Sequence, residues 1–348
     1  MLASTSNLCN RGWKAAFKLK AALKNIDVHP ATRLKLFDVL IKPIICYGSD
    51  VWGPLNNLQG SKSTDIFWKR AEKLPIEIFQ NKFCKNVLGV NNKATNAAVM
   101  GELGRVPMTL YVVKYMLRFA QHIKKEGDRM TLLSAASIED NALPTNKSWK
   151  GSLENILKLF GFAWPADALN DGFITRVFEA MKTNYINYWK RLLGDVNTNT
   201  GKLYLYRQIK SCFKFEPYLQ HVTKNKMRRS MTAIRISTHK LEIETGRYVY
   251  NNGSPISRDQ RCCTLCQQIG ISTPGDELHA LLLCPFFESQ RNELIVFIGN
   301  LYPNFLSLDN ASKMFFMLTC EGDCAKRVSN YIHKVLTFPR PKYGSVGC

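Results

Sequence analysis

The feature of this sequence that most constrains its fold is a group of cysteines and one histidine between Cys262 and Cys284. Cys263 and Cys266 form a C-x-x-C pair, and an H-x4-C pair, His279 and Cys284, follows after twelve intervening residues. Thiolates and an imidazole suit tetrahedral zinc, and a C-x-x-C turn can present two thiolates to one ion. The spacing predicts that Cys263, Cys266, His279 and Cys284 bind one zinc ion, with Cys262 outside the ligand set.

The alternative for this segment is a set of ordinary buried cysteines, with His279 capping a helix or filling a core. A lone C-x-x-C would favour that alternative, but a second pair at this distance favours zinc. Four protein ligands close the coordination shell, whereas a catalytic zinc keeps one position open. We therefore expect a structural zinc that orders its segment, with Glu277 as a helix N-terminal acid or as a hydrogen-bond partner of His279.

The charge of the chain is strongly positive. Lys and Arg number 48 against 27 Asp and Glu, which gives a net charge of +21. Such a field favours polyanions, although a basic run can also be just a solvated face. We expect phosphate contacts with RNA or DNA from the basic residues that precede or flank the cysteines: Lys224, Lys226, Arg228, Arg229, Arg235, Lys240, Arg247, Arg258 and Arg261.

Apolar residues recur at helical spacing through most of the chain, which predicts a mainly α fold with little strand. One clear pattern runs from Thr109 to Lys125, and the segment GELGRVP (Gly101 to Pro107) precedes it as a predicted break. The following ranges are predicted: a helical region 1–132, a linker 133–151 rich in Ser, Asn, Asp and Pro, a second helical region 152–222, a small zinc-stapled C-terminal module 223–338, and a disordered tail 339–348. Tyrosines interleave with lysines in 152–222, where they could stack on bases but are more typical of a core.

The cysteines and the hydropathy bear on the compartment. Eleven cysteines and no recognisable secretory signal favour reduced thiols, and no apolar run approaches the roughly 18 residues of a membrane span. We expect an intracellular protein of the nucleus or cytoplasm, not secreted and without a membrane partner. Cys320-x3-Cys324 is a weaker second metal candidate, because only His333 follows it.

Two groups of segments resemble one known family. The segments RRSMTAIRISTHKLEIETGRY, RCCTLC and DELHALLLCPFFESQRNEL are similar to the zinc-knuckle tail of the reverse-transcriptase protein of LINE-like non-LTR retrotransposons. The segments LKLFDVLIKPIICYGSDVWG, FCKNVLGV and GELGRVPM resemble the thumb and post-polymerase region of the same proteins. The resemblance implies that 1–132 is thumb-like and places the family's zinc ligands on Cys263, Cys266, His279 and Cys284. The twelve-residue gap is longer than the family's spacing.

The polymerases of this family hold two magnesium ions with an aromatic-x-Asp-Asp motif, and no Asp-Asp pair occurs here. We also expect no endonuclease domain upstream of the thumb-like segment. We therefore expect a nucleic-acid-binding, zinc-binding C-terminal part of such a protein, not an enzyme, with no small-molecule substrate. A zinc-stabilised protein-interaction module is the alternative. An enzyme would need a nucleophile, a phosphate loop or an open metal site, and none is recognisable.

Overall fold

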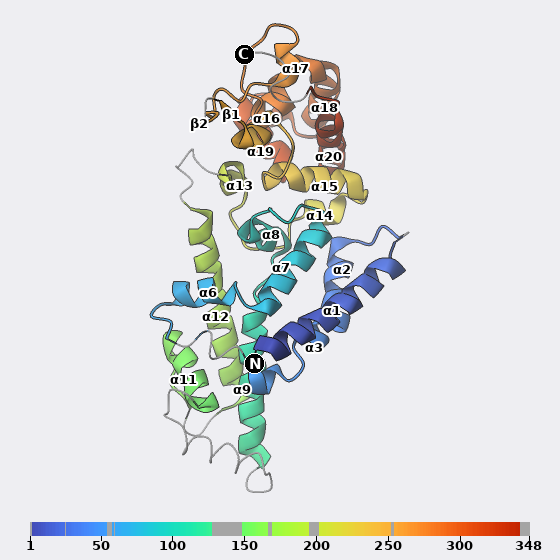
Figure 1. Cartoon of the computed structure of the whole chain (residues 1–348). Coiled ribbons are helices and arrows are strands. Elements are labelled where there is room, and N and C mark those ends of the chain that lie inside the picture. The colour runs from blue at the N-terminus through green and yellow to red at the C-terminus, as the bar shows by residue number, and fades with distance from the viewer. Residues whose placement is uncertain are drawn as a thin grey trace. The chain divides into compact units, whose positions relative to one another are not determined.

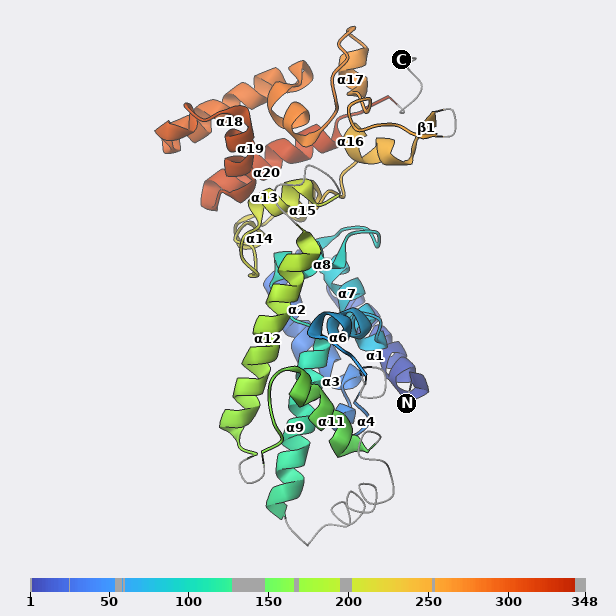
Figure 2. The same cartoon turned by 90° about the vertical axis from the view of Figure 1, so that its left-hand side faces the viewer.

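The structure, a computed structural model of the whole chain, describes residues 2–24, 26–53, 58, 60–126, 148–165, 169–194, 202–251 and 254–341. These residues are mainly helical, which confirms the predicted fold class (Figures 1 and 2). The chain forms two compact units. Unit 1 comprises 1–26, 32–84 and 105–192, and unit 2 comprises 27–31, 85–104 and 193–348.

The two units do not follow the predicted ranges. Both 1–132 and 152–222 are divided between the units, because each unit gathers segments far apart in the sequence. Helical periodicity identifies which residues are helical but not which helices pack together. Most of the predicted linker lies outside the described residues. At its C-terminal end, the Ser148 hydroxyl accepts a hydrogen bond from the backbone N–H of Gly151 (3.0 Å) and so caps a helix that begins at Trp149.

The described residues of unit 1 form helices and the loops between them, without a strand. Its elements are α1 (Leu2–Ala22), most of α2 (Pro30–Leu36), the π-helix η1 (Phe37–Ile41), α3 (Lys42–Ile45), α4 (Ser49–Trp52), α6 (Thr64–Ala71), most of α7 (Pro75–Leu88), α9 (Met108–Glu126), α11 (Trp149–Leu159) and most of α12 (Asp171–Leu193). Aromatic side chains fill much of the core, with Phe67, Trp68 and Trp189 each at most 1% exposed. The Trp68 indole N–H donates to the Asn184 side chain at 2.8 Å, which ties α6 to α12.

One carboxyl group is buried inside unit 1. Glu77 of α7 is 3% exposed and accepts hydrogen bonds from the backbone N–H and the hydroxyl of Thr109, both at 2.7 Å. It thereby satisfies a free N–H at the start of α9. Burial raises the pKa of the Glu77 carboxyl to about 7, although its hydrogen bonds with Thr109 oppose the shift.

Unit 2 combines short helices with one small hairpin. Its elements are α8 (Asn96–Leu103), α13 (Tyr204–Ile209), α14 (Tyr218–His221), α15 (Asn225–Arg235), α16 (Glu242–Thr245), the 3-10 helix η3 (Gly246–Tyr248), β1 (Tyr250–Asn251), β2 (Ser254–Pro255), α17 (Thr264–Gln267), the π-helix η4 (His279–Leu283), the 3-10 helix η5 (Pro285–Phe287), α18 (Glu288–Leu301), the 3-10 helix η6 (Pro303–Phe305), α19 (Asn310–Thr319) and α20 (Gly322–Thr337). β1 and β2 pair antiparallel, with Tyr250 opposite Pro255. Helices α15 and α20 pack together, which joins the two ends of the C-terminal part of the chain.

The core of unit 2 contains a neutral cluster of four charged side chains. Arg235 of α15 is fully buried and donates to the carboxylates of Glu102 (2.9 and 3.1 Å) and Glu216 (2.7 Å). Lys210 pairs with Glu216 as well, and the Tyr218 hydroxyl donates to Glu102 at 2.7 Å. The cluster connects α8, α15 and the segments around α13 and α14. Glu102 lies within the segment predicted as a break, because α8 continues to Leu103 before the chain turns.

Two further observations concern the described residues as a whole. Their ten cysteines are all free thiols. None of their helices combines the length and the apolar composition that crossing a bilayer requires.

Candidate metal centre

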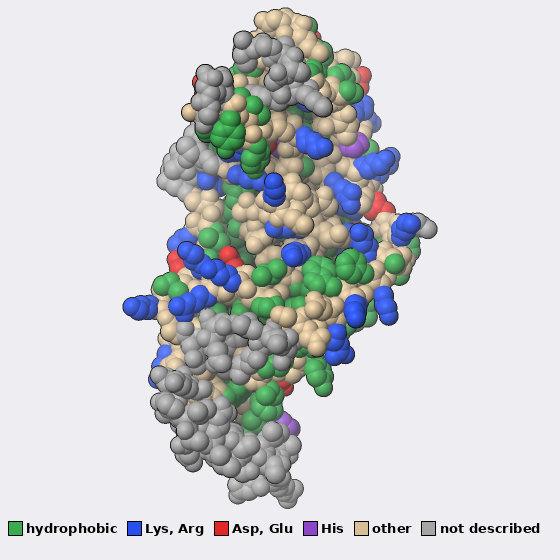
Figure 3. Space-filling view, in the orientation of Figure 1, with side chains coloured by type: hydrophobic (Ala, Val, Ile, Leu, Met, Phe, Trp, Pro, Cys, Tyr) green, Lys and Arg blue, Asp and Glu red, His purple; other side chains and the backbone are tan. Residues whose placement is uncertain are grey.

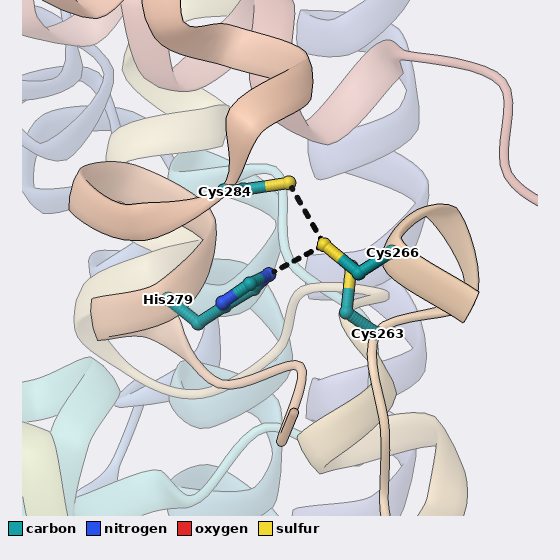
Figure 4. Close-up of side chains that lie close together, drawn as sticks. All are labelled: Cys263, Cys266, His279 and Cys284. Carbon is teal, nitrogen blue, oxygen red and sulfur yellow. Dashed lines mark hydrogen bonds between the residues drawn. The ribbon is translucent and has the colours of Figure 1, made fainter. Parts of the chain in front are cut away.

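The four predicted ligands converge in unit 2. Cys263, Cys266, His279 and Cys284 place their ligand atoms within 4.8 Å of one another, and each of the four residues is at most 5% exposed. Figure 4 shows the cysteine pair approaching from one side, and His279 and Cys284 from the other. This buried group could hold a metal ion.

The distances within the group match the size of a tetrahedral zinc site. Three sulfurs and one nitrogen at zinc's usual bond lengths lie about 3.5 to 3.8 Å apart at the corners of a tetrahedron. The Cys266 sulfur lies 3.3 Å from Nε2 of His279 and 3.8 Å from the Cys284 sulfur. Because the other pairs reach at most 4.8 Å, binding an ion would draw them together by about 1 Å.

The C-x-x-C half forms a single helical turn. Cys263 precedes α17 with extended backbone, and Cys266 lies within α17, so both thiols point to the same side. The carboxylate of Glu242 accepts hydrogen bonds from the backbone N–H (3.2 Å) and the hydroxyl (2.6 Å) of Thr264. Glu242 is 3% exposed, so this buried acid caps the knuckle turn.

The H-x4-C half depends on a π-helical turn. In an α-helix, five residues span about 1.4 turns, which would point His279 and Cys284 to different sides. The segment from His279 to Leu283 is instead a π-helix, and the backbone N–H of Cys284 donates to the carbonyl of His279 at 2.7 Å. This i→i+5 bond makes five residues close to one turn and brings both ligands to the same side.

Two long helices fix the position of this turn. Arg291 of α18 donates to the backbone carbonyl of Cys284 at 2.7 Å, and the Tyr331 hydroxyl of α20 donates to the carbonyl of Leu281 at 2.8 Å. Both side chains are buried. The ligand turn is therefore held by the core of unit 2 and not by the knuckle alone.

The C-terminal segment also reaches the cluster. Arg340 donates to the Glu242 carboxylate (3.1 and 3.2 Å) and lies 3.9 Å from the Cys263 sulfur. The predicted disordered tail 339–348 is thus wrong for Arg340, which Glu242 holds in place. Residues 342–348 lie outside the described residues.

A hydrogen bond from the Cys284 thiol, with a further contribution from His279, holds the pKa of Cys263 well below its usual value and so favours its thiolate.

Other predicted metal-site details have different outcomes. Glu277 hydrogen-bonds His239 (2.9 Å) and not His279, so its predicted partnership with His279 is wrong. Despite burial, that bond with His239 holds the pKa of Glu277 below its usual value.

Cys262 lies 3.3 Å from the Ser272 hydroxyl and outside the ligand group, as expected. Among the described residues no second metal-binding group of three or more occurs, so Cys320 and Cys324 form none with His333.

The structure separates the nine predicted phosphate-binding residues into two classes. Four are exposed: Lys224, Lys226, Arg229 and Lys240. The prediction is wrong for Arg235, which is fully buried among Glu102 and Glu216.

The remaining four arginines have intramolecular partners. Arg228 is 5% exposed and donates to Asp27 and to two backbone carbonyls, so it is a structural residue and not a phosphate contact. Arg261 likewise donates to the carbonyls of Ile243 and Ile256. Arg247 pairs with Glu244 at 2.8 Å, and the Arg258 guanidinium lies over the Tyr204 ring. A run of positive charge in sequence therefore does not give one exposed basic face.

The tyrosines of the second helical region are mainly core residues. Tyr185 and Tyr188 of α12 are each 5% exposed, and Tyr206 and Tyr218 are at most 2% exposed. Such burial fits the alternative that these rings fill a core, and it does not fit base stacking by them.

Sequence reasoning missed the residues that support the site. No local pattern in the sequence marks Glu242, Arg291, Tyr331 or Arg340 as supporting residues. Each acts on a segment that is more than five residues away in the chain, so no short motif marks it. The sequence spacing identified the ligands but not the groups that position them.

Comparisons of the chain with protein-family models, curated proteins and solved structures found no match.

Proposed function

We propose that this chain binds nucleic acid through unit 2, and that one structural zinc ion on Cys263, Cys266, His279 and Cys284 holds the binding surface in shape. The proposed role is binding and not catalysis, since four protein ligands leave no open position on the ion. It corresponds to the role that the resemblance to the C-terminal part of a LINE-like reverse-transcriptase protein implies.

The observation that carries the proposal is the combination of a +21 net charge with exposed basic residues ahead of the buried ligand group. Lys224, Lys226, Arg229 and Lys240 are exposed, and none of them has an ion-pair partner among the described carboxylates. The face in Figure 3 carries many Lys and Arg side chains and few Asp and Glu. Unpaired surface cations favour phosphates, because each contact releases condensed counterions.

The test is salt-dependent binding of fluorescein-labelled RNA and DNA oligonucleotides by the full chain, followed by anisotropy. The logarithm of the association constant should fall linearly with the logarithm of salt concentration, by about 0.7 to 0.9 per phosphate neutralised. Changing Lys224, Lys226 and Lys240 together to Gln should reduce that slope by about 2 to 3.

A matched control removes the same charge elsewhere. Lys14, Lys18 and Lys24 lie exposed on or just after α1 in unit 1, and their change to Gln should leave the slope within about one unit of wild type. If both triple variants reduced the salt slope equally, binding would depend on the net charge of the chain and not on the three lysines of unit 2. An affinity that does not change between 50 and 200 mM salt would refute it and favour the protein-interaction module.

A further inference from the structure

Two exposed tyrosines stand at the β1–β2 hairpin of unit 2. Tyr248 ends η3 and Tyr250 begins β1, and their side chains are 67% and 66% exposed. In Figure 3, hydrophobic side chains, a class that includes tyrosine, lie over β1 and β2 with Lys and Arg side chains nearby. By contrast, Tyr206 and Tyr218 of the same unit are buried. The hairpin therefore presents aromatic rings that the core does not use.

A lysine lies over one of these rings. The Lys93 ammonium, from the segment between α7 and α8, lies 5.7 Å from the centre of the Tyr248 ring. The ammonium of Lys202, just before α13, donates to the backbone carbonyl of Lys93 at 3.4 Å, so it contacts the same segment. Neither lysine has an ion pair with a described carboxylate. One lysine without a carboxylate partner therefore lies next to an exposed aromatic face, and a second contacts its backbone.

A third cation lies in the loop after the hairpin. The Arg258 guanidinium lies 5.7 Å from the centre of the half-buried Tyr204 ring. Its field is partly offset by Asp276, which is close enough to interact with it. The three basic residues come from three separate segments of unit 2, and two of them, Lys93 and Arg258, lie over tyrosine rings.

Exposed aromatic faces beside lysines that have no carboxylate partner suit one class of ligand. Unpaired bases stack on aromatic side chains, while Lys and Arg neutralise the adjoining phosphates. A duplex would use only the cations, because its base faces are already stacked on one another. We propose that Tyr248 and Tyr250 form a stacking platform for single-stranded nucleic acid, flanked by Lys93, Lys202 and Arg258. This inference rests on the proposed function and narrows its ligand.

The experiment measures binding of the full chain to fluorescein-labelled oligo(U), oligo(dT) and a DNA hairpin duplex of equal nucleotide number. Tyr248→Ala and Tyr250→Ala should each weaken binding to both single strands at least about fivefold, the lower end of the range for one base–aromatic stack. Tyr248→Phe and Tyr250→Phe keep the ring and should stay within about twofold of wild type. All four variants should keep the wild-type salt slope, because no charge changes.

Duplex binding provides the second readout. The alanine variants should change duplex affinity less than about twofold, and thermal melting should show that they fold as the wild type does. If the alanine variants bind single strands as tightly as wild type while salt-dependent binding persists, the platform is refuted and the proposed function stands. Equal losses on single strand and duplex also refute the platform. If the wild-type chain binds neither ligand, the proposed function itself fails.

Discussion

At the scale of single residues, Arg235 has a structural role that the basic run around it in the sequence does not indicate. It belongs to a basic run, yet its guanidinium lies fully buried between Glu102 and Glu216. With Lys210 nearby, two positive charges face two negative ones, so the cluster is neutral. Removing one partner of such a cluster leaves a buried charge unpaired, which costs more than the pair itself contributes.

We therefore predict that Arg235→Met lowers the free energy of unfolding of the chain by about 3 to 5 kcal/mol. Urea denaturation followed by circular dichroism would measure the loss. Arg229→Met is the matched control, because Arg229 is exposed on the same helix and should cost less than about 1 kcal/mol. Similar losses of unfolding free energy for the two variants would show that the buried cluster contributes no more to stability than an exposed arginine does.

Glu77 gives unit 1 a defined pH dependence. Its pKa in the folded state is about 7, above the ordinary 4.5, because burial disfavours the carboxylate. The folded state thus binds this proton more tightly than the unfolded state, so the stabilisation is fully present below pH 4.5 and disappears as the pH rises through 7. Between pH 5 and pH 8 the wild type should lose about 2 to 3 kcal/mol more than Glu77→Gln, which keeps the acceptor oxygen but cannot ionise.

Denaturant titrations of both proteins across this pH range would check the difference. Parallel stability curves for the wild type and Glu77→Gln would contradict the raised pKa.

At the scale of elements, the end of α8 is set by one glycine. Gly104 has φ +58° and ψ 32°, a left-handed conformation that closes the helix, and its N–H donates to the carbonyl of Gly101. A Cβ at this position would lie 2.6 Å from the backbone N of Phe215. Both the backbone angle and the close approach therefore require glycine.

Gly104→Ala should destabilise the chain by at least about 2 kcal/mol, since left-handed strain alone costs about 1 to 2 kcal/mol. The control is Gly270→Ala, also in unit 2, where φ is +76° but no atom lies within 4 Å of the place that a Cβ would take. Its cost should be the strain alone. Thermal unfolding of the two variants would separate the contact from the strain, and equal shifts would argue against the contact with Phe215.

The elements also show what sequence patterns can predict. The periodicity from Thr109 to Lys125 predicted α9 (Met108–Glu126) to within one residue at each end, because an apolar stripe is a local property. The ligand spacing likewise identified the Cys263–Cys284 group. The burial of Arg235 escaped prediction because its partner Glu102 lies 133 residues away. The division of the chain into two discontinuous units also escaped prediction, because it depends on which distant helices pack together and periodicity does not specify helix partners.

At the scale of the whole molecule, the metal site should govern one unit only. All four candidate ligands and their supporting residues belong to unit 2. We expect about one zinc per chain after purification, lost in Cys263→Ser and His279→Ala but retained in Cys262→Ser. Elemental analysis would establish this, and zinc retained by Cys263→Ser but lost from Cys262→Ser would overturn the ligand assignment.

Removing the ion by chelation should reduce amide hydrogen-exchange protection in α17 and η4, while α9 of unit 1 keeps its protection. Equal loss of protection in both units would mean that the ion stabilises the whole chain. Unchanged protection everywhere would show that the ligand group needs no metal.

The pairing of Glu102 with Arg235 also has a consequence for how the protein is made. A ribosome adding about 5 to 20 residues per second needs roughly 7 to 27 s to synthesise the 133 residues that separate them. During that interval the Glu102 carboxylate has no arginine partner, and burying it would be unfavourable. Helix α8 should therefore stay exposed to water while the remaining segments of unit 1 are synthesised. Unit 2 should fold only after α15 and then α20 have left the exit tunnel. The nascent chain would fold in two steps, with unit 2 second.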